Sequence, residues 1–210
     1  MDYPSIEQTH QLLEEAEAIS PGPWIKHSYL VGQAARLIAE RHYALDQSIA
    51  YVLGCLHDIG RRDGATSMRH VLVGYHIMIG YGYPTAARIS ITHAFPVKDI
   101  YAVHGEWDCS QAEMEFVQQY LNQITYDDYD RLIQLCDAVS LTSGYSLIEK
   151  RLVDISLRRG LSERILPRWK AYMQLKEGFE NEIGCSIYAL LPGVVENTFG
   201  DLRKTELSSS

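Results

Sequence analysis

Apolar side chains recur every three or four residues along most of the chain, which is the spacing of helices with one buried face. After Asp46, a residue type that favours the N-cap, Ile49, Val52, Leu53 and Leu56 share one such face. No alternating pattern is strong enough to predict a sheet. The sequence therefore predicts an all-α helical bundle, with helices over roughly residues 5–20, 24–42, 47–58, 68–79, 84–93, 111–122, 127–140, 146–159 and 162–179.

Several of the expected helix starts carry local signals. Ser5 with Gln8, and Ser146 with Glu149, have the spacing of capping boxes, in which each side chain bonds to the other residue's backbone amide. Pro84 suits the first position of a helix because it lacks the amide proton that would be unpaired there.

Five of the expected helices carry a polar, metal-type side chain on the apolar face. These residues are His27, His57, His70, His93 and Asp137. A lone histidine on an apolar face is usually a satisfied core residue, but one such group on each of five helices is a poor fit to chance. Burying the carboxylate of Asp137 uncompensated would cost several kcal/mol, so it needs a cation or a hydrogen-bond network. We therefore expect a buried metal site.

The dipeptide His57-Asp58 ends the third apolar stripe. Adjacent residues on a helix point about 100° apart, so the two side chains suit two different directions. The imidazole can face one ion while the carboxylate oxygens are shared between that ion and a second. Asp58 is therefore the candidate bridging ligand.

Composition is that of an ordinary globular protein, with 210 residues, 46% hydrophobic and 22% charged, and we expect a single domain over 1–210. The four cysteines form no Cys-x-x-Cys pair, no apolar run suits a membrane span, and the start lacks signal character, so we expect a cytoplasmic protein without membrane contact. A net charge of -8 disfavours binding to extended nucleic acid but leaves room for a small basic pocket.

The pattern resembles the HD superfamily of metal-dependent phosphohydrolases, whose signature is a histidine, a His-Asp pair and a distant aspartate on a helical bundle. Here these would be His27, His57-Asp58 and Asp137, and binuclear members add histidines that His70 and His93 would match. The resemblance covers roughly residues 24–147, which would form the metal-binding core. The remainder, 148–210, would be a helical extension that completes the bundle or contacts a second copy.

The resemblance implies two divalent transition-metal ions. One would be held by His27, His57, Asp58 and Asp137, and the other by Asp58, His70 and His93. Mixed nitrogen and oxygen ligands suit Fe, Mn, Co, Ni or Zn, and the sequence does not choose among them. His57 and Asp58 would be the catalytic residues, and a hydroxide formed on the metals would hydrolyse the phosphate ester of a small molecule, with nucleotides among the candidates.

Basic residues near the expected site are candidates for binding the substrate phosphate. Arg61 and Arg62 open the polar segment 61–66, which we expect to be a loop at the mouth of the site, and Lys98 lies in the irregular stretch 97–110. Lower-ranked candidates are Lys150 and Arg151.

Two other functions remain open at this stage. Some HD-fold proteins with the same six ligands are diiron oxygenases, and ligand spacing does not separate the two chemistries. The chain could also be a non-catalytic module that senses a ligand through its metal site, although the complete ligand set argues against a degenerate site.

Overall fold

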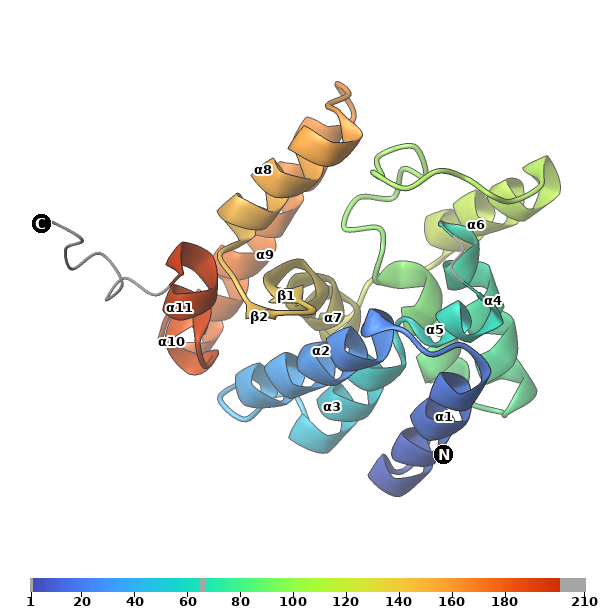
Figure 1. Ribbon diagram of the computed structural model, residues 1–210, viewed down its shortest axis with the longest axis horizontal. Coiled ribbons are helices and arrows are strands. Elements are labelled where there is room, and N and C mark those ends of the chain that lie inside the picture. The colour runs from blue at the N-terminus through green and yellow to red at the C-terminus, as the bar shows by residue number, and fades with distance from the viewer. Residues whose placement is uncertain (1, 65–66, 201–210) are drawn as a thin grey trace, which may run out of the picture.

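The computed structural model describes residues 2–64 and 67–200, which fold almost entirely into helices (Figure 1). The prediction of an all-α helical protein is confirmed. The elements are α1 (Ile6–Ile19), α2 (Pro23–Ala39), α3 (Gln47–Leu56), the 3-10 helix η1 (Ile59–Asp63), α4 (Arg69–Gly80), α5 (Pro84–Thr92), α6 (Gln111–Gln123), α7 (Asp128–Val139), β1 (Ser140–Leu141), β2 (Gly144–Tyr145), α8 (Ile148–Arg159), α9 (Ile165–Ile183), α10 (Ile187–Leu190) and α11 (Val194–Phe199).

The small β1–β2 hairpin was not predicted, because strands of two residues carry no alternating pattern. Its antiparallel pairs are Ser140 with Tyr145 and Leu141 with Gly144. Ser140, which we expected on the last turn of a helix, instead follows the end of α7 as its C-cap. Among residues 2–64 and 67–200, no helix is long and apolar enough to cross a membrane.

The two predicted capping boxes differ in outcome. At α1 the prediction is confirmed, since Gln8 N donates to Ser5 Oγ at 3.1 Å and Ser5 N donates to Gln8 Oε1 at 2.8 Å. At α8 it is wrong, because Leu147 is the N-cap and no side chain of the predicted box caps the helix. The amides of Leu147 and Ile148 donate instead to the hydroxyls of Thr198 and Tyr188, which belong to α11 and α10. The start of α8 is thus fixed by long-range contacts.

The expected loop over 61–66 is also corrected in part. Residues 61–63 belong to the 3-10 helix η1, and Ala65 and Thr66 lie outside the described residues. The stretch 97–110 is irregular, as predicted. The polar tail 201–210 of the expected extension lies outside the described residues as well.

The helices α2 and α3 form the most extensively packed pair and lie beside α7 (Figure 1). Their buried apolar side chains join one large cluster that also includes residues of α1, α9, α10 and α11. A smaller cluster lies around α4 and α6 and includes Val71, Phe95, Val117 and Leu121. The polar residues of interest lie between these packed elements.

Two glycines allow η1, α4 and α5 to approach one another closely. A Cβ at Gly60 would lie 2.0 Å from the carbonyl oxygen of His70, which no real side chain tolerates. A Cβ at Gly74 would lie 2.9 Å from Ser90 Oγ, so Gly74 lets α5 lie close against α4. The absence of these two side chains brings the segment after α3 against α4.

The helix α9 is tied to the irregular stretch that follows α5. The Nη1 of Arg168 donates to the carbonyl oxygens of Ala94 and Ala102 at 2.8 and 3.0 Å. One turn earlier, Arg164 forms an ion pair with Asp99 at 3.1 Å. The C-terminal helices therefore hold the chain segment that begins directly after His93.

Candidate metal centre

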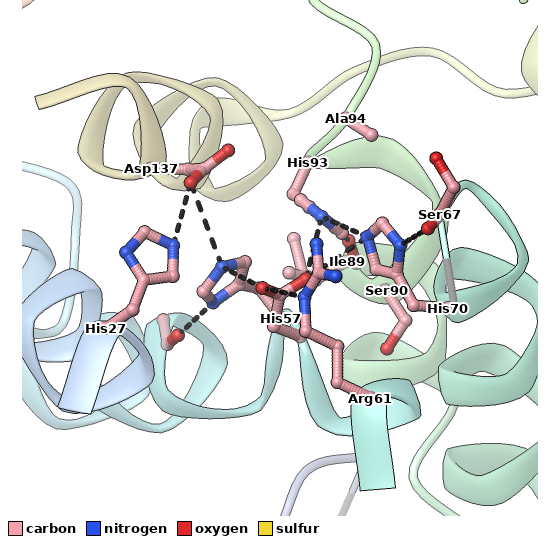
Figure 2. Close-up of polar contacts among 12 residues, drawn as sticks. His27, His57, Arg61, Ser67, His70, Ile89, Ser90, His93, Ala94 and Asp137 are labelled. Carbon is pink, nitrogen blue, oxygen red and sulfur yellow. Dashed lines mark hydrogen bonds and ion pairs between the residues drawn. The ribbon is translucent and has the colours of Figure 1, made fainter. Parts of the chain in front are cut away.

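The six predicted ligands come together between the helices, as Figure 2 shows for five of them by label. Five of them form two buried groups of three that share Asp58, and within each group the ligand atoms lie within 4.8 Å of one another. The first group is His27, His57 and Asp58, and the second is Asp58, His70 and His93. The structure therefore brings together residues from α2, α4, α5 and the junction of α3 with η1.

The two oxygens of Asp58 face different groups. Oδ1 lies 3.1 Å from Nε2 of His70 and 3.6 Å from Nε2 of His93, whereas Oδ2 lies 3.7 Å from Nε2 of His57. A carboxylate placed in this way can offer one oxygen to each of two ions. This arrangement is the one expected of a bridging ligand.

Asp137, on α7, completes the first group from the opposite side. Its Oδ1 lies 3.0 Å from Nε2 of His27 and 4.0 Å from Nε2 of His57 (Figure 2). Its side chain keeps 18% of its surface exposed, whereas that of Asp58 keeps 5%. Asp137 therefore lies at the edge of the cluster that solvent reaches.

Three of the histidines are held by backbone carbonyl groups. Nδ1 of His57 bonds to Gly54 O at 2.7 Å and Nδ1 of His93 to Ile89 O at 3.1 Å, and Nδ1 of His70 bonds to Ser67 O. Because a carbonyl oxygen only accepts hydrogen bonds, each Nδ1 carries the proton. In the neutral rings Nε2 then has a bare lone pair, which is how metal-binding histidines are usually oriented.

Two acceptor atoms at the centre of the cluster have no donor facing them. Among the described residues, His57 Nε2 and Asp58 Oδ1 are buried and have no hydrogen-bond partner, so the 3.1 Å contact of Asp58 Oδ1 with His70 lacks hydrogen-bond geometry. Nε2 of His70 and of His93 lie 3.4 Å apart. Burying unpaired acceptors costs free energy, and a cation among them removes that cost. These imidazole nitrogens and carboxylate oxygens are ligand atoms that fit divalent transition metals.

The ionisation states also suit metal binding. Burial lowers the pKa of His57, and burial together with the neighbouring His57 lowers the pKa of His93 to about 3. Burial alone would raise the pKa of Asp58, but Arg61, His57 and His70 outweigh it and hold that pKa well below its usual range. Neutral imidazoles and ionised carboxylates are the forms that bind metal ions.

Each carboxylate of the cluster has an arginine beside it. Arg61 Nε donates to Asp58 Oδ2 at 2.6 Å (Figure 2). Arg151 Nη2 lies 3.5 Å from Asp137 Oδ1, and its Nη1 donates to Ser140 O. Arg151 is a lower-ranked candidate from the sequence, because nothing in the pattern of α8 signals that its first turn meets α7 at this point.

The other two predicted phosphate-binding residues contact other parts of the molecule. Arg62 lines a surface cavity of about 250 Å³ together with His76 and Tyr81. Lys98 donates from Nζ to Ile124 O and lies 5.2 Å from the centre of the Tyr126 ring. Their binding of phosphate stays a prediction.

A family model described as HD domain matches residues 24–142, which is more than half of the chain. The chain belongs to the HD domain family. All six predicted ligands lie inside the matched region, and the two His/Asp groups fit an HD-type metal site, so the resemblance to the HD superfamily is confirmed. The role of each residue as a ligand stays a prediction. Neither the curated proteins nor the solved structures compared with this HD domain protein include a significant match. Arg151 lies beyond the matched region.

Proposed function

We propose that this HD domain protein is a metal-dependent phosphohydrolase that acts on a phosphate ester of a small molecule. The observation that carries the proposal is the placement of Asp58, whose two oxygens face two separate histidine groups, beside the buried and unpaired Nε2 of His57. This supports a binuclear site in which His27, His57, Asp58 and Asp137 hold one ion, and Asp58, His70 and His93 hold the other. Mn, Fe, Co, Ni and Zn all suit these ligands.

Divalent metals, when bound, lower the pKa of coordinated water to near neutrality and stabilise negative charge that develops on phosphoryl oxygens. The protein's own residues prepare the site for this chemistry. The carbonyl groups of Gly54, Ser67 and Ile89 fix three rings by accepting from Nδ1, and Arg61 fixes Asp58 through Oδ2. Preorganised ligands of this kind lose no free energy to reorientation during the reaction.

The proposed substrate is a small phosphorylated compound, and nucleotides are among the candidates. The net charge of -8 opposes attraction of extended nucleic acid, while Arg61 and Arg151 place two guanidinium groups beside the metal ligands. Of the three phosphate-binding residues that the sequence suggested, Arg61 lies closest to the metal ligands, because it contacts Asp58 directly. A cytoplasmic location is proposed from the spacing of the four cysteines and from the lack of an apolar run that suits a membrane span.

The test measures metal content and phosphate release together. The protein, purified without an affinity nickel column, is analysed by plasma mass spectrometry and then assayed with Mn, Fe, Co, Ni or Zn against a panel of phosphate esters. We expect close to two ions per chain and release of inorganic phosphate. His70→Ala and His93→Ala should each lower occupancy to about one ion, whereas the exposed His76→Ala on α4 should not change it.

Three results would overturn the proposal. Unchanged occupancy in both histidine variants would make His70 and His93 structural and the site mononuclear. Oxygen uptake by the iron-loaded protein without phosphate release would instead establish the diiron oxygenase chemistry, for which the same ligands are suited. Full metal loading with neither reaction would support a sensing module.

A further inference from the structure

The charged groups of the cluster balance one another before any ion is added. Asp58 pairs with Arg61 at 2.6 Å, and Asp137 lies 3.5 Å from Arg151, so two carboxylates face two guanidinium groups. The four histidines contribute no negative charge. Each divalent ion therefore adds two positive charges that these side chains leave uncompensated, and an excess of positive charge in a largely buried site attracts an anion.

The two arginines differ in how tightly they are bound to their carboxylates. The 2.6 Å contact of Arg61 is a short, charge-assisted hydrogen bond, whereas the 3.5 Å contact of Arg151 lies at the long limit for one. Arg151 is anchored at its other nitrogen, because Nη1 donates to Ser140 O, and its side chain keeps 19% of its surface exposed. The guanidinium is therefore anchored at Nη1, and Nη2, in its long contact with Asp137, is the nitrogen available to a ligand that enters from solvent.

A second arginine of the C-terminal helices shows the contrast. Arg168 on α9 donates to two backbone carbonyl groups and also, from Nη2, to the hydroxyl of Tyr172 at 2.9 Å. Those contacts join α9 to the stretch after His93 and give Arg168 a structural task. Arg151 instead directs its guanidinium at Asp137, the most exposed of the carboxylates in the cluster.

We propose that Arg151 binds the phosphoryl group of the substrate and that this substrate is a phosphate monoester; the inference rests on the proposed function. A monoester carries about two negative charges at neutral pH and a diester carries one, so the monoester better balances the charge of the loaded site. In the reaction, the oxygen of water bonds to phosphorus and the ester P–O bond breaks. One proton of the water passes to the leaving alcohol oxygen, and inorganic phosphate is the second product.

The residue that recognises the substrate would thus come from α8, beyond the region that the family model matches. A planar guanidinium presents two parallel N–H groups to a phosphoryl group, which a lysine cannot do. When a cation occupies the Asp137 side of the cluster, it takes over the role of neutralising that carboxylate, and the loose ion pair with Arg151 becomes dispensable.

The experiment uses inorganic phosphate as the probe and does not depend on turnover. Calorimetric titration of the metal-loaded full chain compares the wild type with Arg151→Gln, Arg151→Lys and the control Arg158→Gln. Arg158 is exposed and lies two turns further along α8, so its variant carries the same charge change away from the cluster. We expect Arg151→Gln to weaken phosphate binding by roughly 10- to 100-fold, Arg151→Lys to weaken it less, and Arg158→Gln to leave it unchanged.

Steady-state kinetics and metal analysis of the same proteins complete the test. With p-nitrophenyl phosphate, Arg151→Gln should raise KM by a similar factor, while metal content and the melting temperature stay those of the wild type. The wild type should prefer this monoester to bis-p-nitrophenyl phosphate.

Several outcomes would overturn the inference. Unchanged phosphate affinity in Arg151→Gln excludes contact with the phosphoryl group. Loss of metal in step with loss of phosphate binding, in both the Gln and the Lys variants, shows that Arg151 only supports Asp137. A preference of the wild type for the diester overturns the monoester assignment. Failure of the proposed function looks different: the wild type would bind phosphate through Arg151 and yet hydrolyse neither ester.

Discussion

The helix α7 carries two inward-facing carboxylates two turns apart, and their surroundings differ sharply. Asp130 is fully buried, and its oxygens accept from Arg88 Nε at 3.1 Å, from Arg88 Nη2, from Thr92 Oγ1 at 2.7 Å and from the amide of Asp127 at 2.9 Å. Asp137 faces histidine nitrogens and one loosely held guanidinium. The first carboxylate is satisfied by donors, whereas the second lies in a cluster that contains buried acceptors without a donor.

This difference separates a structural buried charge from a ligand. Around Asp130, donors and acceptors are matched, so the network is stable as it stands. Around Asp58 and Asp137, His57 Nε2 and Asp58 Oδ1 are buried without a hydrogen bond among the described residues. Burial of an acidic residue therefore does not by itself distinguish a structural charge from a metal ligand. The buried unpaired atoms beside the residue make that distinction.

The largest expected effect is that of Asp58→Ala. Because one carboxylate faces both histidine groups, its loss should remove both ions and reduce activity to background. Replacing partners outside the ligand shell of metal sites typically costs 10- to 100-fold, so loss of a shared ligand should cost more than about 100-fold. Metal analysis and phosphate release measure the result, with the exposed Asp63→Ala as the matched control. If Asp58→Ala retains two ions, the bridging role is wrong.

Asp130→Ala should reduce the stability of the protein and leave its metal binding unchanged, the opposite of Asp58→Ala. It leaves the guanidinium of Arg88, whose side chain is only 26% exposed, without its main partner, and it leaves the Thr92 hydroxyl unpaired. We expect the free energy of unfolding to fall by about 3 kcal/mol or more, while the folded fraction still binds its full complement of metal. Urea denaturation and metal analysis of the same sample test this. A stable Asp130→Ala protein that has lost metal would erase the distinction between the two carboxylates.

Acid should lower the free energy of unfolding of the chelator-treated protein through the histidines of the candidate metal centre. The pKa of His93 falls from an ordinary value near 6.5 to about 3 on folding, so the unfolded chain binds more protons between these two values. Stability from this group is therefore fully present above about pH 6.5 and is lost as the pH falls toward 3, at up to about 1.4 kcal/mol per pH unit. The free energy of unfolding, measured with urea at pH 4 to 7, should fall less steeply with decreasing pH for His93→Gln than for the wild type. For the exposed His76→Gln it should fall as steeply as for the wild type.

The sequence contains most of the information about the metal ligands, for a physical reason. The four histidines and Asp137 lie on the apolar stripe of a helix or directly after its last residue, so the helical period turns them inward, where neutral imidazole or carboxylate groups need a partner. Asp58 follows His57 as the N-cap of η1. Asp130 carries no such signal. It stands in the first turn of α7, where acidic residues are favoured by the helix dipole, and nothing local indicates that Arg88 and Thr92 bury it.

Contacts between distant segments account for what the sequence did not predict. Ser146 and Glu149 have the spacing of a cap, yet the start of α8 is capped by hydroxyls about 40 and 51 residues further along the chain. The pairing of Arg151 with Asp137 depends on the position that the β1–β2 hairpin gives to α8. Strands of two residues produce no periodic pattern in the sequence, so this position was not predicted. Helix periodicity thus predicts which face is buried, and only the folded chain shows which faces meet.

The smallest expected effect concerns two neighbours in the chain that belong to different regions. Thr92 donates to Asp130, and His93 directs Nε2 toward Asp58. Thr92→Val keeps the shape of the side chain but removes a hydrogen bond to a charged acceptor, so we expect a loss of about 1.5 kcal/mol in the free energy of unfolding. Metal occupancy should remain that of the wild type, since Arg88 still holds Asp130 and the backbone of α5 still holds His93 through Ile89 O. Loss of an ion in Thr92→Val would mean that the hydrogen-bond network around Asp130 positions the ligand next to it, and that the two regions act as one.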